Sequence, residues 1–245
     1  MISRMEALKK ILKDKRHIVF FDLEGTQTTH EIIEIGAVAV SLNDECKIRK
    51  YAKGFSCYVK AHSPVGRIVT NLTGITQKTL DDKGLLFHEA MERFRKYVSK
   101  YKNDVIFCSY GNNDISMLEA SSYANYDDGI EFVRFIKRNY FDYSQFFGTY
   151  VKSEKNNIYS VTNALKLFDA VFEGTAHDAL ADSMNLANLY EQFLEQKETV
   201  AALYKKTLSR YHSLPVPVQK VMNELNSGNT VDQETFNRLI KESLE

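Results

Sequence analysis

Two carboxylates stand at the end of an apolar run, HIVFFDLEGT, which extends from residue 17 to residue 26. Side chains alternate faces along a β-strand, so Asp22 and Glu24 should point the same way, roughly 6.5–7 Å apart. Two like charges at that distance repel by about 2–2.5 kcal/mol at an effective dielectric constant near 20. The pair is therefore either well solvated or arranged around a cation.

Two further acids occupy comparable positions. Asp114 follows the apolar segment DVIFCSY (104–110) and begins a predicted helix, where the helix dipole favours a carboxylate. Asp182 lies four residues after Asp178, a spacing at which like charges mildly destabilise a helix. His177 precedes Asp182 by five residues and would approach it only from the irregular start of the helix. Each position alone has a structural explanation.

Taken together, the four acids lie at strand ends or in the first turns of helices, where the loops of an α/β sheet converge on a site. Two divalent cations would neutralise four carboxylates, and hard ions such as Mg²⁺ or Mn²⁺ suit an all-carboxylate site. Two metals about 3.5–4 Å apart can stabilise both the attacking and the leaving oxygen of a phosphoryl displacement. A histidine at the edge could take a proton from the attacking water.

The elements that position these acids follow from hydrophobic periodicity. Residues 17–24, 31–41 and 54–59 predict a three-stranded opening, and residues 104–110 predict another strand. A spacing of three to four residues predicts an amphipathic helix over 85–101, with the stripe Phe87, Met91, Phe94, Val98 and Tyr101. Strands first, then alternating strands and helices, indicate a mixed α/β sheet covered by helices.

Two more helices are expected in the second half of the chain. Ser160 is the expected N-cap of a helix over 160–168. Thr175 and Asp178 have capping-box spacing at the start of the next helix. The expected apolar stripe of that helix is Leu180, Met184, Ala187 and Leu194.

The two ends of the chain have a different character. Residues 1–16 form a charged amphipathic segment that lacks the features of a secretory signal. Two of the three prolines fall in HSLPVPV, which predicts a boundary near 212–217. The segment after it predicts two short helices joined by a Ser-Gly-Asn turn, a helical appendage without a core of its own.

Composition narrows the class of protein. Of the 245 residues, 44% are hydrophobic, and no run approaches the roughly 18–20 apolar residues of a membrane span. The three cysteines form no close pair, so neither a zinc site nor a disulfide framework is indicated, and a cytoplasmic location is expected. Lys plus Arg equals Asp plus Glu at 32 each, so net charge predicts no general attraction to nucleic acid. The basic runs at 47–53 and 134–138 are expected to be solvated faces, with contact to nucleic acid as the alternative.

The motifs resemble a known family. FDLEGT, Asp114 after a strand, and HDALAD (177–182) are similar, in order, to the three motifs of the DEDDh branch of the DEDD 3′–5′ exonucleases. EIIEIGAV resembles the second strand of that family, and LTGIT (72–76) resembles its loop beside the substrate 3′ end. Within the branch, the chain looks most like the Eri-type exoribonucleases, although Gly25, Gln27 and Tyr110 replace their alanine, cysteine and tryptophan, and Ala61 replaces a proline.

This resemblance implies a ribonuclease-H-like α/β fold, a mixed sheet of about five strands flanked by helices. Together with the character of the two chain ends, it gives the expected organisation: an N-terminal helix (1–16), an exonuclease domain (17–197) and a C-terminal helical appendage (198–245). Asp22, Glu24, Asp114 and Asp182 would hold two divalent cations, Mg²⁺ or Mn²⁺, with His177 as general base. The substrate-binding candidates are Gly25, Thr26, Leu72 and Ile75. The expected partner is a nucleic acid 3′ end, with RNA favoured over DNA and no membrane.

Three alternatives remain. The same fold could act on the 3′ end of DNA. FFDLEGT also resembles the h-h-D-x-D-G-T motif of haloacid-dehalogenase-type phosphatases, in which Asp22 would be a nucleophile, although its second acid is glutamate and strands follow at once. The chain could also be an inactive nucleic-acid-binding module, although all five expected residues are present. Substrate length, oligomeric state and the role of the extension do not follow from the sequence.

Overall fold

A single mixed sheet forms the centre of the molecule. The computed structural model describes residues 3–126, 129–210 and 214–244. The strand order is β3-β2-β1-β5-β6, and β4 also pairs with β2, which gives six strands. β1 (His17–Gly25) runs antiparallel to β2 (Ile32–Leu42) and parallel to β5 (Ile106–Ser109). The predicted α/β fold with a mixed sheet of about five strands is confirmed.

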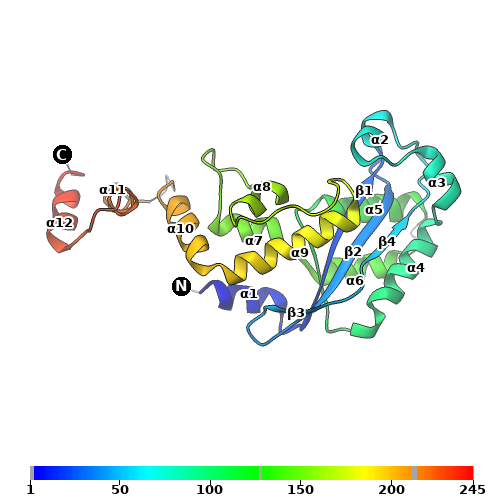
Figure 1. Ribbon diagram of the computed structural model, residues 1–245, viewed down its shortest axis with the longest axis horizontal. Coiled ribbons are helices and arrows are strands. Elements are labelled where there is room, and N and C mark those ends of the chain that lie inside the picture. Colours follow the sequence, from blue (N-terminus) through cyan, green and yellow to red (C-terminus); the bar gives the residue numbers. More distant parts are fainter. Residues whose placement is uncertain (1–2, 127–128, 211–213, 245) are drawn as a thin grey trace.

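The other elements surround this sheet (Figure 1). The remaining strands are β3 (Ile48–Tyr51), β4 (Phe55–Tyr58) and β6 (Tyr140–Asp142). The helices, with the 3-10 turn η1 (Ser99–Tyr101), are α1 (Arg4–Leu12), α2 (Arg67–Thr73), α3 (Gln77–Lys83), α4 (Phe87–Val98), α5 (Asn113–Ala124), α6 (Ile130–Arg138), α7 (Tyr143–Tyr150), α8 (Val161–Lys166), α9 (Ala179–Glu195), α10 (Lys197–Leu208), α11 (Val216–Asn226) and α12 (Gln233–Lys241).

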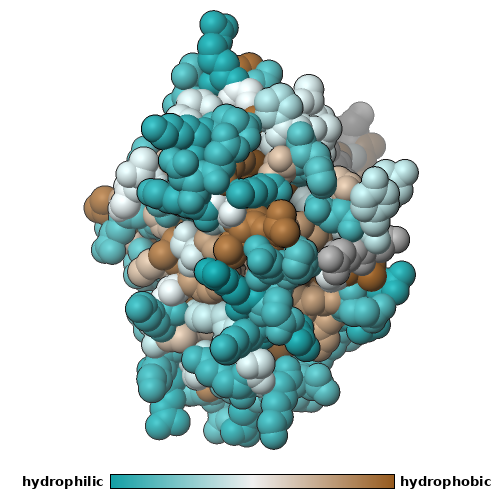
Figure 2. Space-filling view, turned by 90° about the vertical axis from the view of Figure 1, so that its right-hand side faces the viewer, coloured by the Kyte–Doolittle hydropathy of each residue, from teal (hydrophilic) through white to brown (hydrophobic). Residues whose placement is uncertain are grey.

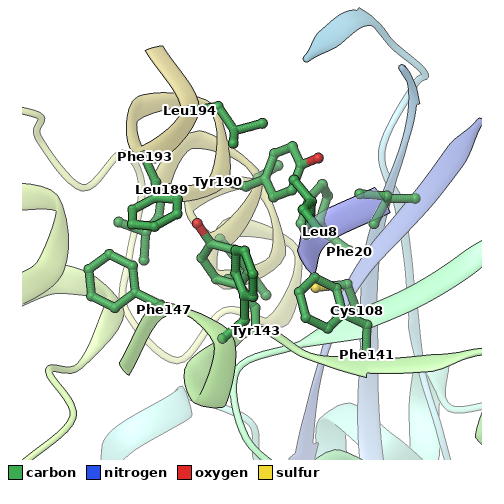
Figure 3. Packing of buried hydrophobic residues seen from close by; sticks show 14 of the residues in the cluster. Leu8, Phe20, Cys108, Phe141, Tyr143, Phe147, Leu189, Tyr190, Phe193 and Leu194 are labelled. Atoms are coloured by element: carbon green, nitrogen blue, oxygen red, sulfur yellow. The ribbon is translucent and has the colours of Figure 1, made fainter. Parts of the chain in front are cut away.

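Alternation along β1 divides the core into two layers, one on each face of the sheet. Ile18 and Phe20 pack with side chains of α7 and α9, whereas Val19 and Phe21 pack with those of α4 and α6. The ring of Phe20 is fully buried 5.4 Å from that of Tyr190, in the aromatic layer that Figure 3 shows. Burying such a side chain contributes about 1.5–3 kcal/mol.

This alternation determines where the acids point. Asp22 and Glu24 continue the face of Ile18 and Phe20, because side chains two residues apart share a face. That face is covered by α9, which crosses the sheet diagonally in Figure 1. The two acids therefore point toward the first turn of α9, which carries Asp182.

The sequence analysis missed several elements. The basic run at 47–53 contains β3, an edge strand with mostly exposed side chains, so it has no apolar alternation to reveal it. The run at 134–138 lies within α6, whose buried side chains are Phe132, Val133 and Ile136. β6, α7 and α10 were also missed. Whether these segments form a helix or a strand depends on their packing against the sheet and α9, and local hydrophobic periodicity does not reveal that packing.

The start of the long helix differs from the prediction. α9 begins at Ala179 with Asp178 as N-cap, whose side chain accepts from the Ala181 N–H at 2.8 Å, so the capping box from Thr175 is wrong. Its buried stripe includes Ala187 and Leu194 as predicted, but Met184 is 46% exposed. Ser160 caps α8 as predicted, accepting from the Asn163 N–H at 3.4 Å.

The terminal helices differ in how they contact the body. Leu8 of α1 and Val200 of α10 belong to the core layer of α9. α11 and α12 follow α10 and lie beyond it, away from the sheet (Figure 1). The two short helices predicted for the C-terminal segment are confirmed as α11 and α12. Part of the predicted boundary at 212–217 lies outside the described residues. The division of the chain into domains at residues 16 and 197 stays a prediction. Each helix in the described part of the chain is too short or too polar to cross a membrane.

Candidate metal and catalytic site

Three carboxylates converge where β1 ends. One oxygen each from Asp22, Glu24 and Asp182 lies within 4.8 Å of the other two. Two of these side chains come from one strand and the third from the first turn of α9, and all three are partly buried. Oxygen ligands at this density fit hard divalent cations, and their shared negative charge needs protons or cations to offset it.

Asp114 lies beside these three acids. Its side chain is 5% exposed, and its Oδ1 accepts a hydrogen bond of 3.0 Å from the backbone N–H of Leu23, the residue between Asp22 and Glu24. The structure therefore brings three of the four predicted acids together and places the fourth against the strand that carries two of them.

A hydrogen-bond network at Gly111 fixes the turn that presents Asp114. The Gly111 N–H donates to Asp142 at 3.0 Å, and its carbonyl accepts from Ser109 at 2.9 Å and from the hydroxyl of Tyr140. Gly111 has a φ of +110°, a conformation that other residues rarely adopt. Sequence reasoning missed these residues because β6 supplies two of them from a distant part of the chain.

His177 lies at the exposed edge of the site. Its Nδ1 is 3.8 Å from Oε1 of Glu24, and its side chain is 52% exposed. It stands in the turn before α9 with a φ of +65°, not in the first turn of the helix as predicted. Its backbone N–H donates to Oδ2 of Asp182 at 2.8 Å, so this turn also holds the carboxylate in place.

Gly36 allows α9 to reach the acids. It pairs with Asp22 across the antiparallel strands and lies on the face that α9 covers. A Cβ atom at this position would lie 2.0 Å from the carbonyl carbon of Ala179 and 2.1 Å from the nitrogen of Leu180. Because the strand has no side chain here, the backbone of α9 touches the sheet and Asp182 approaches β1.

Gly36→Ala should therefore displace the start of α9. We expect a loss of about 1–3 kcal/mol in the free energy of unfolding, the usual cost of overpacking a core, and a weaker metal-induced rise in Tm. Gly54→Ala is the matched control, because its Cβ would meet only the flexible end of Leu180 on the same helix, at 2.8 Å. Urea unfolding and thermal melts with and without Mg²⁺ would measure both effects. Equal behaviour of the two variants would contradict this role of Gly36.

Burial and their mutual repulsion strongly shift the pKa values of the acids. Burial and the neighbouring carboxylates, Asp114 first among them, raise the pKa of Asp22 well above its ordinary range. Burial and the charge of Asp182 raise the pKa of Glu24 to about 8, and burial raises that of Asp114 to about 6. Burial also raises the pKa of Asp182, although the His177 N–H acts against it. The metal-free site therefore holds protons near neutral pH, which divalent cations would displace.

These shifts predict the pH dependence of the metal-free protein. An acid whose pKa is higher in the folded state binds more protons there, so the free energy of unfolding falls as pH rises between the two pKa values. For Glu24 this range extends from the ordinary value of 4.5 to about 8. Acids with lowered pKa values, such as Glu31, act below this range. Urea unfolding in EDTA should show decreasing stability from about pH 5 to pH 8; a flat or rising profile would contradict the shifts.

A fifth carboxylate, missed by sequence reasoning, adjoins the site. Glu34 of β2 is 4% exposed and pairs directly across from Glu24. Its Oε1 accepts from the hydroxyl of Ser56 at 3.2 Å and its Oε2 from the N–H of Ala179 at 3.3 Å. It thus connects β2, β4 and the first residue of α9. An acid within the otherwise apolar run IIEIGAVAV is the signal that could have revealed it.

The four predicted substrate-binding residues lie in different environments. Gly25 is partly buried, and a Cβ there would lie 2.6 Å from the sulfur of Met117. Thr26 is 1% exposed, and its hydroxyl bonds to Thr29 and accepts from the N–H of Glu31. Leu72 is 53% exposed on α2. Ile75 is 3% exposed within a small core cluster, so its side chain faces the interior. The role of these four residues in substrate binding stays a prediction.

Comparison with known proteins identifies the family. A family model described as an exonuclease, RNase_T, matches residues 19–190, which include all the acids of the site. The chain belongs to this exonuclease family. A comparison with curated protein sequences gave no significant match.

Solved structures share the fold of this exonuclease chain. A 3′-exonuclease solved for 3′-end-specific recognition of a histone mRNA stem-loop is 18% identical with a TM-score of 0.60, covering 75% of this chain and 83% of that one. The nuclease domain of 3′hExo, a DEDDh family member bound to rAMP, is 20% identical with a TM-score of 0.58, covering 75% and 94%. E. coli Exonuclease I with dT13 is 16% identical with a TM-score of 0.57, covering 81% and 45%. The ribonuclease-H-like exonuclease fold is thus confirmed.

Proposed function

We propose that this protein is a metal-dependent 3′–5′ exonuclease that releases nucleoside 5′-monophosphates, with RNA preferred as in the Eri-type enzymes. The observation that carries the proposal is the convergence of Asp22, Glu24 and Asp182 within 4.8 Å at the end of β1, with Asp114 alongside. The rAMP complex of 3′hExo supports a nucleoside monophosphate as the product.

In this proposal the four acids hold the metal and His177 moves the proton. When bound, two Mg²⁺ or Mn²⁺ ions would supply the positive charge that stabilises the attacking and leaving oxygens. The Glu24 carboxylate, 3.8 Å from Nδ1 of His177, favours the tautomer with its proton on Nδ1. Nε2 is then free to accept a proton from the attacking water. The hydrogen bond from the His177 backbone to Asp182 keeps this imidazole at the edge of the acids.

A DNA-directed enzyme of the same fold is the second candidate, because the fold is also that of E. coli Exonuclease I, which was solved with single-stranded dT13 and dA16. Because the chain belongs to the exonuclease family, we no longer propose the alternative of a haloacid-dehalogenase-type phosphatase, in which Asp22 would be the nucleophile. An inactive binding module would show affinity for oligonucleotides without turnover.

A timed digest of matched 5′-labelled RNA and DNA oligonucleotides with Mg²⁺ or Mn²⁺ tests the proposal. We expect a ladder shortened one nucleotide at a time from the 3′ end, with 5′-monophosphates as products and faster loss of the RNA. A 3′-terminal phosphate should slow the reaction greatly. Cleavage of a circular substrate would contradict the exonuclease assignment, and faster loss of DNA would contradict the RNA preference.

A further inference from the structure

The segment that carries His177 lies outside the helices and strands. It joins α8, which ends at Lys166, to α9, which begins at Ala179. Residues 173–178 are all exposed, and the surface of the molecule on this side is mostly hydrophilic (Figure 2). Loops with few buried contacts open at a low cost in free energy. The imidazole therefore needs attachments elsewhere in the fold to stay beside Glu24.

Asn185 of α9 holds the first residue of this exposed segment. Its side chain is buried, with 2% exposure. Its Oδ1 accepts from the backbone N–H of Glu173 at 2.9 Å, and its Nδ2 donates to the carbonyl of the same residue at 2.8 Å. Nδ2 also donates to the carbonyl of Ala181 at 2.8 Å, so the helix itself orients the amide. A carboxamide is the side chain that offers a donor and an acceptor side by side in this way.

Two further contacts continue along α9 toward the acids. A Cβ on Gly174 would lie 3.0 Å from that of Ala181, so the backbone of residue 174 lies close against the helix. The N–H of His177 then donates to Asp182 at 2.8 Å. Asp182 and Asn185 are three residues apart and therefore neighbours on one side of the helix. One side of α9 thus carries an acid of the site and, a turn further, the amide that holds the segment of the histidine.

We propose that Asn185 is a positioning residue for His177: its amide fixes the exposed segment against α9 and so keeps the imidazole at the edge of the acids. This inference rests on the proposed function, in which His177 accepts a proton from the attacking water. A general base must lie within hydrogen-bond reach of its proton, and small displacements of a reacting group lower the rate strongly. The four acids belong to β1, α5 and α9 rather than to this segment, so their affinity for metal should depend little on Asn185.

Single-turnover kinetics of Asn185→Leu test this role, because leucine has nearly the same shape but no hydrogen-bonding group. With a saturating oligonucleotide, we expect the rate to fall about 5- to 100-fold, the range for buried polar groups that lose their partner. Affinity for the oligonucleotide and the metal-induced rise in Tm should be nearly unchanged. Asn185→Ala, which removes the same groups without adding bulk, should behave alike.

Asn188→Leu is the matched control on the same helix. The Oδ1 of Asn188 accepts from Nε2 of Gln192 at 3.1 Å, one turn further along α9 and away from the segment. This variant should therefore keep the rate of the wild type. Exchange of backbone amide hydrogens in the metal-free protein gives a second comparison. Residues 173–177 should exchange faster in Asn185→Leu than in the wild type, and at the wild-type rate in Asn188→Leu.

A double-mutant cycle separates positioning from general damage. Asn185→Leu should cause little further loss of rate in the His177→Gly protein, since no imidazole is left to position. An unchanged rate, unchanged amide exchange, an undiminished loss in the His177→Gly protein, or a loss of metal affinity in parallel with the rate would overturn the inference. Wild-type protein that binds the oligonucleotide without cleaving it would overturn the proposed function instead, and amide exchange would still decide whether Asn185 holds the segment.

Discussion

Asp22→Asn should reduce nuclease activity by about three orders of magnitude, because several kcal/mol of transition-state stabilisation by the metals would be lost. Asp22 is central to the site, since burial and then the charges of Asp114, Asp182, Glu24 and Glu34 raise its pKa. The same change should abolish the rise in Tm with Mg²⁺ or Mn²⁺. A cation present at 100 times its Kd stabilises the wild type by about 2.7 kcal/mol per site.

The metal-free Asp22→Asn protein should be at least as stable as the wild type at pH 8, because a buried repulsion is removed. Glu31→Gln is the control for loss of a buried acid nearby. Glu31 is 4% exposed, but its carboxylate accepts from the backbone N–H groups of His62 and Ser63, and these bonds hold its pKa low despite burial. This control should lose stability yet keep its metal-induced rise in Tm. Equal metal stabilisation in wild type and Asp22→Asn would exclude Asp22 as a principal ligand.

His177→Gly should lower the single-turnover rate by about 10²- to 10⁴-fold, the usual contribution of a general base. Glycine is the suitable replacement because residue 177 has a φ of +65°, which glycine adopts freely. The backbone N–H that binds Asp182 is then retained, so metal affinity should change little. Since the side chain is 52% exposed, added imidazole should enter the vacated space and restore part of the rate.

His30→Gly provides the matched control, because His30 is also an exposed histidine with positive φ, 55°, but makes no hydrogen bond or ion pair with the acids of the site in the described part of the chain. It should retain nearly full activity and show no response to imidazole. Loss of metal affinity together with rate in His177→Gly would identify His177 as a ligand. An unchanged rate would leave it a purely structural residue of the turn before α9.

The residues of the site could be predicted from the sequence because their signals are local. Asp22 and Glu24 follow an apolar strand at a spacing of two, and Asp114 follows another strand. The run HDALAD contains the histidine and the last acid of the site, five residues apart. The amphipathic helix α4 was equally readable, because its buried side chains recur every three to four residues. These patterns depend only on neighbours along the chain.

The arrangement of those residues was decided by the tertiary structure. Asp182 meets Asp22 and Glu24 because Gly36 lets the backbone of α9 touch β2, and Glu34 fastens the first residue of that helix. Such contacts join segments more than a hundred residues apart, so no local pattern contains them.

The sequence alone also could not decide which of two candidate residues caps the start of α9. Thr175 and Asp178 both offer a capping side chain, and only the approach of α9 to the sheet selects Asp178 and leaves His177 in the preceding turn with positive φ. In the LTGIT motif (72–76), the sequence likewise does not tell which of the two apolar side chains is exposed, yet packing buries Ile75 and leaves Leu72 exposed. The sequence by itself determined which chemical groups the site contains, whereas long-range packing decided how close they lie and which of them face solvent.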